Sequence, residues 1–379
     1  MSYIQMADEL LREKLSETLR VRCQWRENVI SLLKSGTRQV YIFGTGQVGQ
    51  HFFHDMRALG VIFQGFSDNE RNKWGTEICN GLKCIPPEDL GRVENPFVFV
   101  GVGMHSKDVF RQLEEMGIKD ILDATDFLMN FFFDDMEKSS LEDVKKNIHL
   151  VFELLSDEES QKVLWRRLQG ICSFEKRFGS PQYFYDIYQD NQYFPDDIVQ
   201  FTENDVLVDC GAYTGDTLAE FLKLKKPFKK YIAYELSQRN FEILASNMRN
   251  VHGGAFELVP HHAGVGCRNE DIYYDENISA TTMGTGKTKG TLVRLSDHLG
   301  DETVSFIKMD IEGAEMDALR GAEELIRKQH PKLAICIYHK FSDLWEIPLY
   351  IKSLYPDYRL YIRHHTPLYL ETVCYAIPS

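Results

Sequence analysis

The segment VLVDCGAYTGDT (residues 206–217) joins a short apolar run to two closely spaced glycines. The run VLVDC predicts a buried β-strand, and the residues after the glycines begin a helical pattern. Gly211 and Gly215 allow a ligand to approach the backbone where the strand ends, which is where open α/β sheets bind their ligands. The spacing Asp209-x-Gly211-x-x-x-Gly215 differs from that of a dinucleotide fingerprint. The segment therefore predicts an α/β sheet whose ligand has no pyrophosphate.

The next apolar run, KYIAYE, ends in the acidic residue Glu235. In a βαβ unit, an acid about 20 residues after the first glycine can accept hydrogen bonds from both ribose hydroxyls. Glu235 follows Gly211 at about this separation. The two signals together predict a nucleoside cofactor.

Short apolar runs alternate with helical stretches from Val206 to the end of the chain, which is typical of an α/β domain. They are VLVDC, KYIAYE, FELVPHHAGV, DIYYD, SFIKMDI, KLAICIY, YRLYIR and TVCYAI. No helical periodicity separates the last two runs, so we expect an antiparallel pair at the edge of the sheet. We assign residues 203–379 to this domain.

The first half of the chain contains a second, smaller α/β pattern. Residues 1–36 predict one or two amphipathic helices that pack on this smaller domain. The runs QVYIF, VIFQGF, FVFVGV and DILDA predict a Rossmann-like parallel sheet in residues 37–126. Residues 127–202 are charged and helix-forming, and we expect a helical connector there. Two domains also agree with a length of 379 residues, because single cores stop growing at roughly 250–300 residues.

The segment SFIKMDIEGAEMDALRGA (residues 305–322) resembles the signature of the FkbM family of methyltransferases. The segments VDCGAYTGDT, IYHKFSDLWEIPLYIK and YIRHHTPLYLETVCYAIP also resemble that family and occur in its order, so the resemblance covers residues 193–378. It implies a Rossmann-like domain that binds S-adenosylmethionine (SAM). It also implies transfer of the methyl group to an oxygen, often on a sugar or a natural product.

The resemblance implies roles for individual residues as well. Asp209, Gly211 and Gly215 would line the methionine part of SAM, and Glu235 would hold its ribose. With the residues that adjoin them, the predicted cofactor site consists of Asp209, Gly211, Tyr213, Thr214, Gly215, Asp216, Thr217, Glu235, Leu236, Ala263 and Asp310.

Methyl transfer to a hydroxyl requires a group that accepts the proton, and histidine is the commonest choice. Our first candidate is His339, which follows the KLAICIY run. Asp310 and Glu312, which the resemblance puts at the reaction centre, complete the predicted catalytic set. Other histidines after apolar runs are His261, His262, His364 and His365.

We expect no metal at this site, because no helix carries ligands at metal-binding spacing. Alternatively, the clustered histidine and carboxylates could hold a divalent cation that activates the hydroxyl. Glu315 and Asp317 belong to the first turn of a predicted helix, where carboxylates favour the N-terminus without any catalytic role. Residues 284–288 imitate a phosphate loop but lack its first glycine, so we expect a flexible loop that could cover the acceptor site.

The segment QVYIFGTGQVGQHFF contains an intact Gly44-x-Gly46-x-x-Gly49 pattern between a predicted strand and a predicted helix. Asp68 ends the following run, at the separation expected for an acid that binds ribose. The segment resembles the small nucleotide-sugar-binding domain that precedes the catalytic part of some bacterial sugar acyltransferases. The resemblance implies a sugar nucleotide, and the alternative is an empty, purely structural half-Rossmann unit. The predicted second site consists of Gly44, Gly46, Gln47, Val48, Gly49 and Asp68.

The composition excludes several classes of partner. A net charge of −14 argues against nucleic acid, which is bound by Lys/Arg surfaces. Apolar runs such as residues 97–102 are far shorter than the roughly 20 residues that span a bilayer, and the first residues contain no secretory apolar region. The eight cysteines show no paired spacing. We expect a cytoplasmic protein with reduced cysteines and a small-molecule acceptor.

The sequence as a whole favours a SAM-dependent O-methyltransferase that acts on a sugar, a nucleotide sugar or a glycan precursor. One alternative is an NAD(P)-dependent nucleotide-sugar oxidoreductase or epimerase, but the chain contains no Tyr-x-x-x-Lys pair for proton relay. The other alternative, a non-catalytic nucleotide-binding protein, would require a decayed SAM site, whereas the residues of that site are present.

Overall fold

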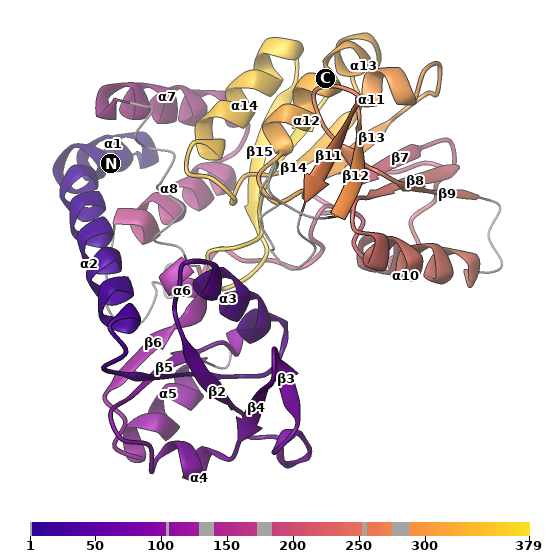
Figure 1. Cartoon of the computed structure of the whole chain (residues 1–379). Coiled ribbons are helices and arrows are strands. Elements are labelled where there is room, and N and C mark those ends of the chain that lie inside the picture. Colours follow the sequence, from indigo (N-terminus) through magenta and orange to yellow (C-terminus); the bar gives the residue numbers. More distant parts are fainter. Residues whose placement is uncertain (1, 104–105, 129–139, 173–183, 252–255, 275–287) are drawn as a thin grey trace.

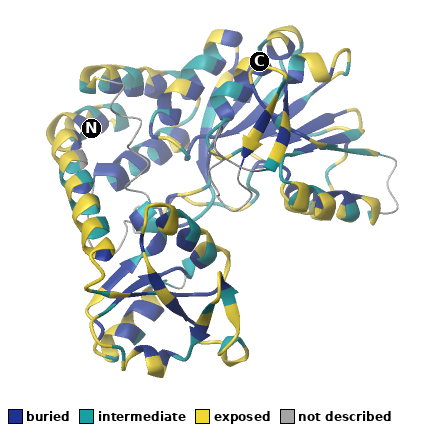
Figure 2. Ribbon diagram, in the orientation of Figure 1, coloured by how far each residue is buried: buried dark blue, intermediate teal, exposed yellow. Residues whose placement is uncertain are grey.

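The computed structural model describes residues 2–103, 106–128, 140–172, 184–251, 256–274 and 288–379. The chain forms two α/β units, and an arm of helices runs from one unit to the other (Figure 1). Buried residues are concentrated in the sheet of each unit (Figure 2).

The smaller unit is built on six short strands. They are β1 (Gln39–Phe43), β2 (Phe63–Ser67), β3 (Glu77–Cys79), β4 (Leu82–Ile85), β5 (Pro96–Val100) and β6 (Asp120–Asp123). Their order in the sheet is β3-β4-β2-β1-β5-β6, and all neighbours pair in parallel except β3 and β4, which form an antiparallel hairpin. The predicted parallel sheet is confirmed. The β3–β4 hairpin was not predicted, because its strands are too short to show a period.

Helices cover both faces of this smaller sheet. Side chains of α3 (Gln47–Ala58) and α6 (Ala124–Leu128) pack on one face. Those of α4 (Pro87–Leu90) and α5 (Ser106–Glu115) pack on the other. The unit is therefore a three-layer α/β structure.

The larger unit contains a seven-stranded sheet. Its strands are β7 (Val206–Cys210), β8 (Lys230–Glu235), β9 (Glu257–His262), β13 (Phe306–Met309), β14 (Lys332–Cys336), β15 (Arg359–His364) and β16 (Thr372–Ile377). The order is β15-β16-β14-β13-β7-β8-β9, and β16 runs antiparallel to both of its neighbours while the other pairs are parallel. The predicted antiparallel pair at the sheet edge is confirmed.

Every residue of the central strand β7 is buried, as expected for a parallel strand covered on both sides. One face of the sheet is covered by α9 (Asp216–Lys223) and α10 (Gln238–Arg249). The other face is covered by α11 (Leu295–His298), α12 (Glu315–Gly321), α13 (Glu323–Gln329) and α14 (Asp343–Leu354). The carboxyl ends of the parallel strands therefore lie along one edge, where the predicted site residues are found.

A small three-stranded sheet lies beside the large one. It consists of β10 (Gly264–Val265), β11 (Glu270–Tyr274) and β12 (Thr288–Val293), and its buried side chains pack against Leu236. The loop predicted at residues 284–288 lies outside the described residues, apart from Thr288, which begins β12.

The predicted connector contains the helices α7 (Leu141–Leu154) and α8 (Glu158–Cys172). The N-terminal helices are α1 (Tyr3–Leu10), the π-helical turn η1 (Leu11–Leu15) and α2 (Ser16–Lys34). The expectation that the N-terminal helices pack on the smaller unit is wrong for α1. Its apolar face continues through η1 and is buried against α7 and α8 in the core of the larger unit. The second half of α2 does pack on the smaller core, through Trp25, Val29, Ile30 and Leu33.

Candidate active site

The turn between β7 and α9 carries the first predicted cofactor residues. Gly211 and Gly215 have φ angles of +79° and +92°, a backbone conformation that side chains disfavour. A Cβ atom on Gly211 would lie 1.9 Å from the carbonyl oxygen of Asp310. The turn therefore runs directly against the end of β13, and only glycine fits at position 211.

Asp209 stabilises this turn through its buried partner, Lys308. It is the register neighbour of Lys308 on β13, and the two side chains form an ion pair with a 2.9 Å separation between Nζ and Oδ1. Tyr231 donates a hydrogen bond of 2.6 Å to the other carboxylate oxygen, and Lys308 donates one of 2.7 Å to the carbonyl of Gly211. Both charged groups are almost completely buried. We therefore expect Asp209 to hold the turn in position rather than to contact the cofactor.

Glu235 is adjacent to the other side of the same turn. Its carboxylate accepts hydrogen bonds from the backbone amides of Tyr213 (2.9 Å) and Ser237 (2.8 Å). Burial raises the pKa of this carboxyl group, and the two amides oppose the shift. The two sequence signals for a nucleoside site, the glycine turn and the distant acid, are thus in direct contact.

The remaining predicted cofactor residues surround the turn. Thr214 belongs to it, and its carbonyl accepts a hydrogen bond from Asn247 on α10. Asp216 and Thr217 begin α9. Leu236 follows Glu235, and its carbonyl accepts a hydrogen bond from Tyr274 of the small sheet. The last of the set, Ala263, is buried just after β9.

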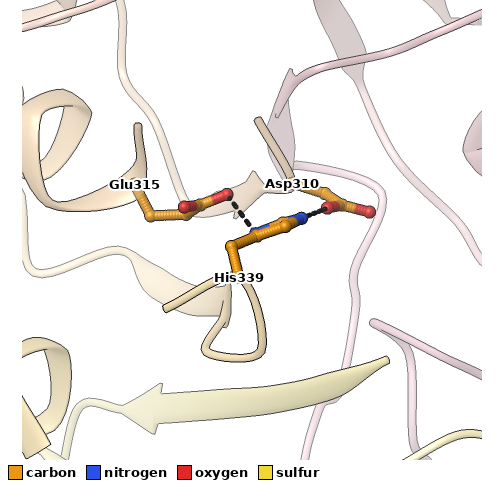
Figure 3. Close-up of side chains that lie close together, drawn as sticks. All are labelled: Asp310, Glu315 and His339. Atoms are coloured by element: carbon orange, nitrogen blue, oxygen red, sulfur yellow. Dashed lines mark ion pairs between the residues drawn. The ribbon is translucent and has the colours of Figure 1, made fainter. Parts of the chain in front are cut away.

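The three predicted catalytic residues lie together beside this turn, joined by a fourth residue. The ring of His339, just after β14, lies between the carboxylates of Asp310 and Glu315 (Figure 3). Its Nδ1 is 3.0 Å from Glu315, and its Nε2 is 3.5 Å from both Asp310 and Glu312. Glu315 is fully buried, whereas the Glu312 side chain is 55% exposed. Glu312 therefore borders the solvent side of the cluster.

Asp310 is fixed by two tyrosines that the sequence did not indicate. Tyr193 and Tyr338 donate hydrogen bonds of 2.7 Å and 3.0 Å to its two carboxylate oxygens. Gln192 in turn donates hydrogen bonds to the Tyr193 hydroxyl and to Glu371. These residues are distant from Asp310 in the sequence, so only the fold brings them together.

The electrostatics of the cluster differ from the prediction that His339 accepts a proton. Burial favours the neutral ring, but the carboxylates of Glu315, Asp310 and Glu312 outweigh it and raise the pKa of His339 to about 10. Partial burial raises the pKa of Glu312 to about 7, with Asp310 adding to the shift and His339 opposing it. At neutral pH the ring of His339 is therefore protonated, and it has no lone pair for a further proton.

The other four candidate histidines have structural surroundings. The buried His364 bonds to the Thr372 hydroxyl and the Leu368 carbonyl, and burial lowers its pKa well below the usual value. His365, bonded to the Tyr375 hydroxyl, has its pKa lowered by burial to about 4. The rings of His261 and His262 stack on Tyr234 and Phe241, respectively.

Glu315 has surroundings that its place at a helix start does not predict. Its carboxylate does accept a hydrogen bond from the Ile311 amide, as a residue at a helix start can, but it also lies in full burial beside His339. Asp317, by contrast, forms a surface ion pair with Arg320.

The predicted second site has a similar turn. Gly44 has a φ of +111°, and a Cβ on Gly49 would lie 2.1 Å from the Gly44 carbonyl, so both glycines are required by the backbone. A Cβ on Gly46 would meet no heavy atom within 4 Å. Asp68 accepts hydrogen bonds from the Thr45 amide (3.0 Å) and hydroxyl (2.6 Å).

This second turn faces the first one. Gln47, the first residue of α3, donates a hydrogen bond of 2.8 Å to the hydroxyl of Tyr213 in the turn after β7. The neighbouring Val48 is partly exposed. The glycine turns of the two units therefore lie side by side.

A mostly parallel sheet with one antiparallel strand near its edge, and a glycine turn closed by an acid on the next strand, defines a Rossmann-like methyltransferase fold. Residues 209–367 match the Methyltransferase FkbM domain. The chain therefore contains a methyltransferase domain of the FkbM type, whose methyl donor is SAM.

The chain is also similar to two known proteins, one in sequence and one in fold. "Methyltransferase 1" of Beauveria bassiana (strain ARSEF 2860) is 28% identical over 160 residues, which cover 34% of this chain. The chain spans 62% of the length of that relative. The crystal structure of methyltransferase FkbM from Methylobacillus flagellatus KT has the same fold over 98% of both chains, with a TM-score of 0.68 and 23% identity. No helix in the described part of this chain is both long enough and apolar enough to cross a membrane.

Proposed function

We propose that the protein transfers the methyl group of SAM to a hydroxyl oxygen of a sugar or a nucleotide sugar. The observation that supports this most directly is the contact between the donor turn and the catalytic cluster. Gly211 lies against the Asp310 carbonyl, so a donor held by the turn after β7 has its sulfonium end close to Asp310, Glu312 and His339.

The reaction needs little covalent chemistry from the protein. The acceptor oxygen forms a bond to the methyl carbon as the carbon–sulfur bond breaks, and the bonding electron pair remains on sulfur as S-adenosylhomocysteine (SAH). Alignment of the two reactants supplies much of the rate enhancement. The hydroxyl proton must pass to a group of the site.

We revise our prediction of that group. Because His339 lies among three carboxylates, it is better suited to orient them than to accept a proton. Glu312 has the most exposed side chain of the cluster, where an acceptor can reach it. We therefore propose Glu312 as the proton acceptor.

The smaller unit supports a nucleotide-linked acceptor. The backbone at Gly46 is open to solvent, and the adjacent Gln47 reaches the donor turn. A sugar nucleotide with its diphosphate on the turn after β1 would therefore have a sugar near the methyl donor. The alternative is a smaller unit that binds nothing and serves only as structure.

The donor site is tested by calorimetric titration with SAH. We expect Glu235→Ala to weaken SAH binding roughly 10–100-fold, the worth of a charged hydrogen bond. Glu242→Ala, which removes a carboxylate from the neighbouring helix α10, is the control and should leave the affinity unchanged. Equal affinities for the wild type and Glu235→Ala would contradict the ribose assignment.

The acceptor is tested by incubation with SAM and a panel of free sugars and sugar nucleotides. We expect mass spectrometry to detect the gain of one methyl group on a sugar nucleotide. A parallel titration with NAD addresses the oxidoreductase alternative, because tight NAD binding without SAH binding would contradict the proposed reaction.

A further inference from the structure

The residues around His339 offer more than a proton acceptor. Asp310 at the end of β13, Glu315 in the first turn of α12 and His339 after β14 each present a donor atom, and these three atoms all lie within 4.8 Å of one another. Two carboxylates and an imidazole at one sheet edge form a set of groups that divalent cations bind in proteins.

One buried atom of this cluster lacks a hydrogen-bond partner, as expected if a ligand normally occupies the site. The Oε2 atom of Glu315, whose side chain is fully buried, has no hydrogen-bond partner in the part of the chain that the structure describes. The ring nitrogens of His339, which is 10% exposed, have carboxylate oxygens at 3.0–3.5 Å as their partners. Buried polar atoms are normally satisfied, so atoms of this kind require an explanation.

One separation fits a coordination shell directly. With metal–ligand bonds of about 2.1 Å, adjacent ligand atoms are roughly 3.0–3.5 Å apart in octahedral and tetrahedral sites. The 3.5 Å between His339 Nε2 and Asp310 Oδ1 is long for a hydrogen bond and falls at the end of this range. Glu315 contacts the other ring nitrogen, Nδ1, so its carboxylate would turn toward Nε2 to join the same shell. Tyr193 and Tyr338 would orient Asp310, as residues behind a metal ligand do.

The charge around the three residues also favours a cation. Glu312 also lies beside His339, with an oxygen 3.5 Å from Nε2, so three carboxylates surround the ring. Lys308 lies near Asp310 but is also paired with Asp209, so it offsets only part of this negative charge. Lys340 donates to the Gly313 carbonyl, so the His339 ring faces more carboxylates than its single charge can balance.

We propose that Asp310, Glu315 and His339 bind one hard divalent cation, of the Mn²⁺ or Mg²⁺ class, which holds the acceptor hydroxyl for methyl transfer. The cation takes the place of the proton on the His339 ring, which is released to solvent, because an imidazole binds a metal only in its neutral form. The oxygen-rich ligand set favours these ions, and the single imidazole is compatible with Mn²⁺ in particular. The role in methyl transfer rests on the proposed function, whereas cation binding does not.

The cation would act on the acceptor alone. Bound to the cation, the hydroxyl loses its proton more readily and passes it to Glu312. The resulting oxygen then attacks the methyl carbon, and the sulfur keeps the electron pair of the broken bond. No oxidant or further reactant is required.

Mn²⁺ binding to the full-length protein, treated first with EDTA and then dialysed, tests the proposal. We expect electron paramagnetic resonance to detect one bound Mn²⁺ per chain. Asp310→Asn and His339→Ala should weaken binding at least ~10-fold, since even the residues that orient ligands are worth 10–100-fold. The control Asp317→Asn removes a carboxylate from the same turn of α12 as Glu315 and should bind Mn²⁺ like the wild type.

Spectra of the wild-type protein test the proposal even if these variants do not fold. Electron spin echo spectra of bound Mn²⁺ should contain the modulation of an imidazole nitrogen. Absence of that modulation, or Mn²⁺ binding no tighter than in His339→Ala, would overturn the proposal. SAH binding to the EDTA-treated protein distinguishes failure of the cation proposal from failure of the proposed function. A protein that binds SAH but no Mn²⁺ would contradict the cation site and would not contradict methyl transfer.

Discussion

Lys308 carries a buried charge in the middle of an apolar strand, FIKM, and its partner Asp209 is buried equally. Removal of one member of such a pair leaves the other charge uncompensated, which typically costs 3–5 kcal/mol. We therefore expect Lys308→Met to lower the free energy of unfolding by about 3 kcal/mol or more. Urea denaturation followed by circular dichroism measures the change.

Lys289→Met is the matched control for this variant. Lys289 forms an ion pair with Asp271, but both side chains are more than half exposed, and exposed pairs contribute little to stability. Equal losses of stability in the two variants would mean that burial of the Lys308 pair has no special energetic consequence.

Among individual site residues, the sequence predicted those that directly follow a strand. It did not predict those that the fold brings to the site from other parts of the chain. Gly211 and Glu235 were identifiable because a βαβ unit fixes the distance between them. Tyr193 and Tyr338 were not, since nothing in a single sequence links either one to Asp310. Lys308 could have been noticed, because a lysine inside an apolar run requires a buried partner.

At the scale of elements, the contact between the turn after β7 and the end of β13 determines the geometry of the donor site. Gly211→Ala introduces a Cβ where the Asp310 carbonyl already lies and also adopts an unfavourable φ. Gly36→Ala separates these effects, because Gly36 has a similar φ of +72° but nothing within 4 Å of the added atom.

We expect Gly36→Ala to lose only the roughly 1–2 kcal/mol of the left-handed backbone. Gly211→Ala should lose more stability and also SAH affinity, because the turn must move away from β13. Thermal unfolding and calorimetric titration of both variants measure the two quantities. Unchanged SAH affinity in Gly211→Ala would contradict the assignment of this turn to the donor.

The link between helix α8 and strand β15 should depend on pH. Asp157, just before α8, forms an ion pair with Arg363 on β15 and also accepts hydrogen bonds. Burial alone would raise the pKa of Asp157. Hydrogen bonds from Arg363 and Ser160 outweigh burial and lower this pKa below its usual 3.8. A lowered pKa in the folded state stabilises the protein above the unfolded value, and this contribution is lost as the pH falls through the folded value.

We therefore expect Asp157→Asn to be less stable than the wild type at pH 7, with the difference shrinking as the pH falls below 3.8. Melting temperatures of both proteins across this range test the expectation. A difference that stays constant down to the lowest pH would show that the carboxylate charge is not the stabilising feature.

The prediction of helices and strands succeeded where the apolar runs were long. It failed for a very short strand and for a helix that could pack on either of two cores. The strands β7 and β8, five and six residues long, were evident from the apolar runs VLV and YIAY, whereas β3 has only three residues. The helix α1 was correctly predicted as amphipathic, but periodicity shows that a helix has an apolar face and does not show which core buries it.

At the scale of the whole molecule, the notable feature is that the glycine turns of both units meet. Gln47 and Tyr213 join them directly, and the match to a crystal structure over 98% of both chains shows that the two-unit fold is shared. An acceptor bound to the smaller unit would therefore not have to travel to reach the donor. The arrangement gives the smaller unit a role in binding the acceptor, provided that its turn binds a diphosphate.

That condition leads to a prediction at Gly46, which precedes α3 with an ordinary extended backbone (φ −75°) and open space around it. Both Asp and Asn are favourable at the position before a helix, so neither Gly46→Asp nor Gly46→Asn should destabilise the protein. The added carboxylate would repel an anionic diphosphate, whereas the amide would not. We expect Gly46→Asp to weaken sugar-nucleotide binding at least ~10-fold more than Gly46→Asn, while both variants bind SAH like the wild type, as calorimetric titration would measure. Equal sugar-nucleotide affinities in the two variants would favour the alternative in which the smaller unit is purely structural.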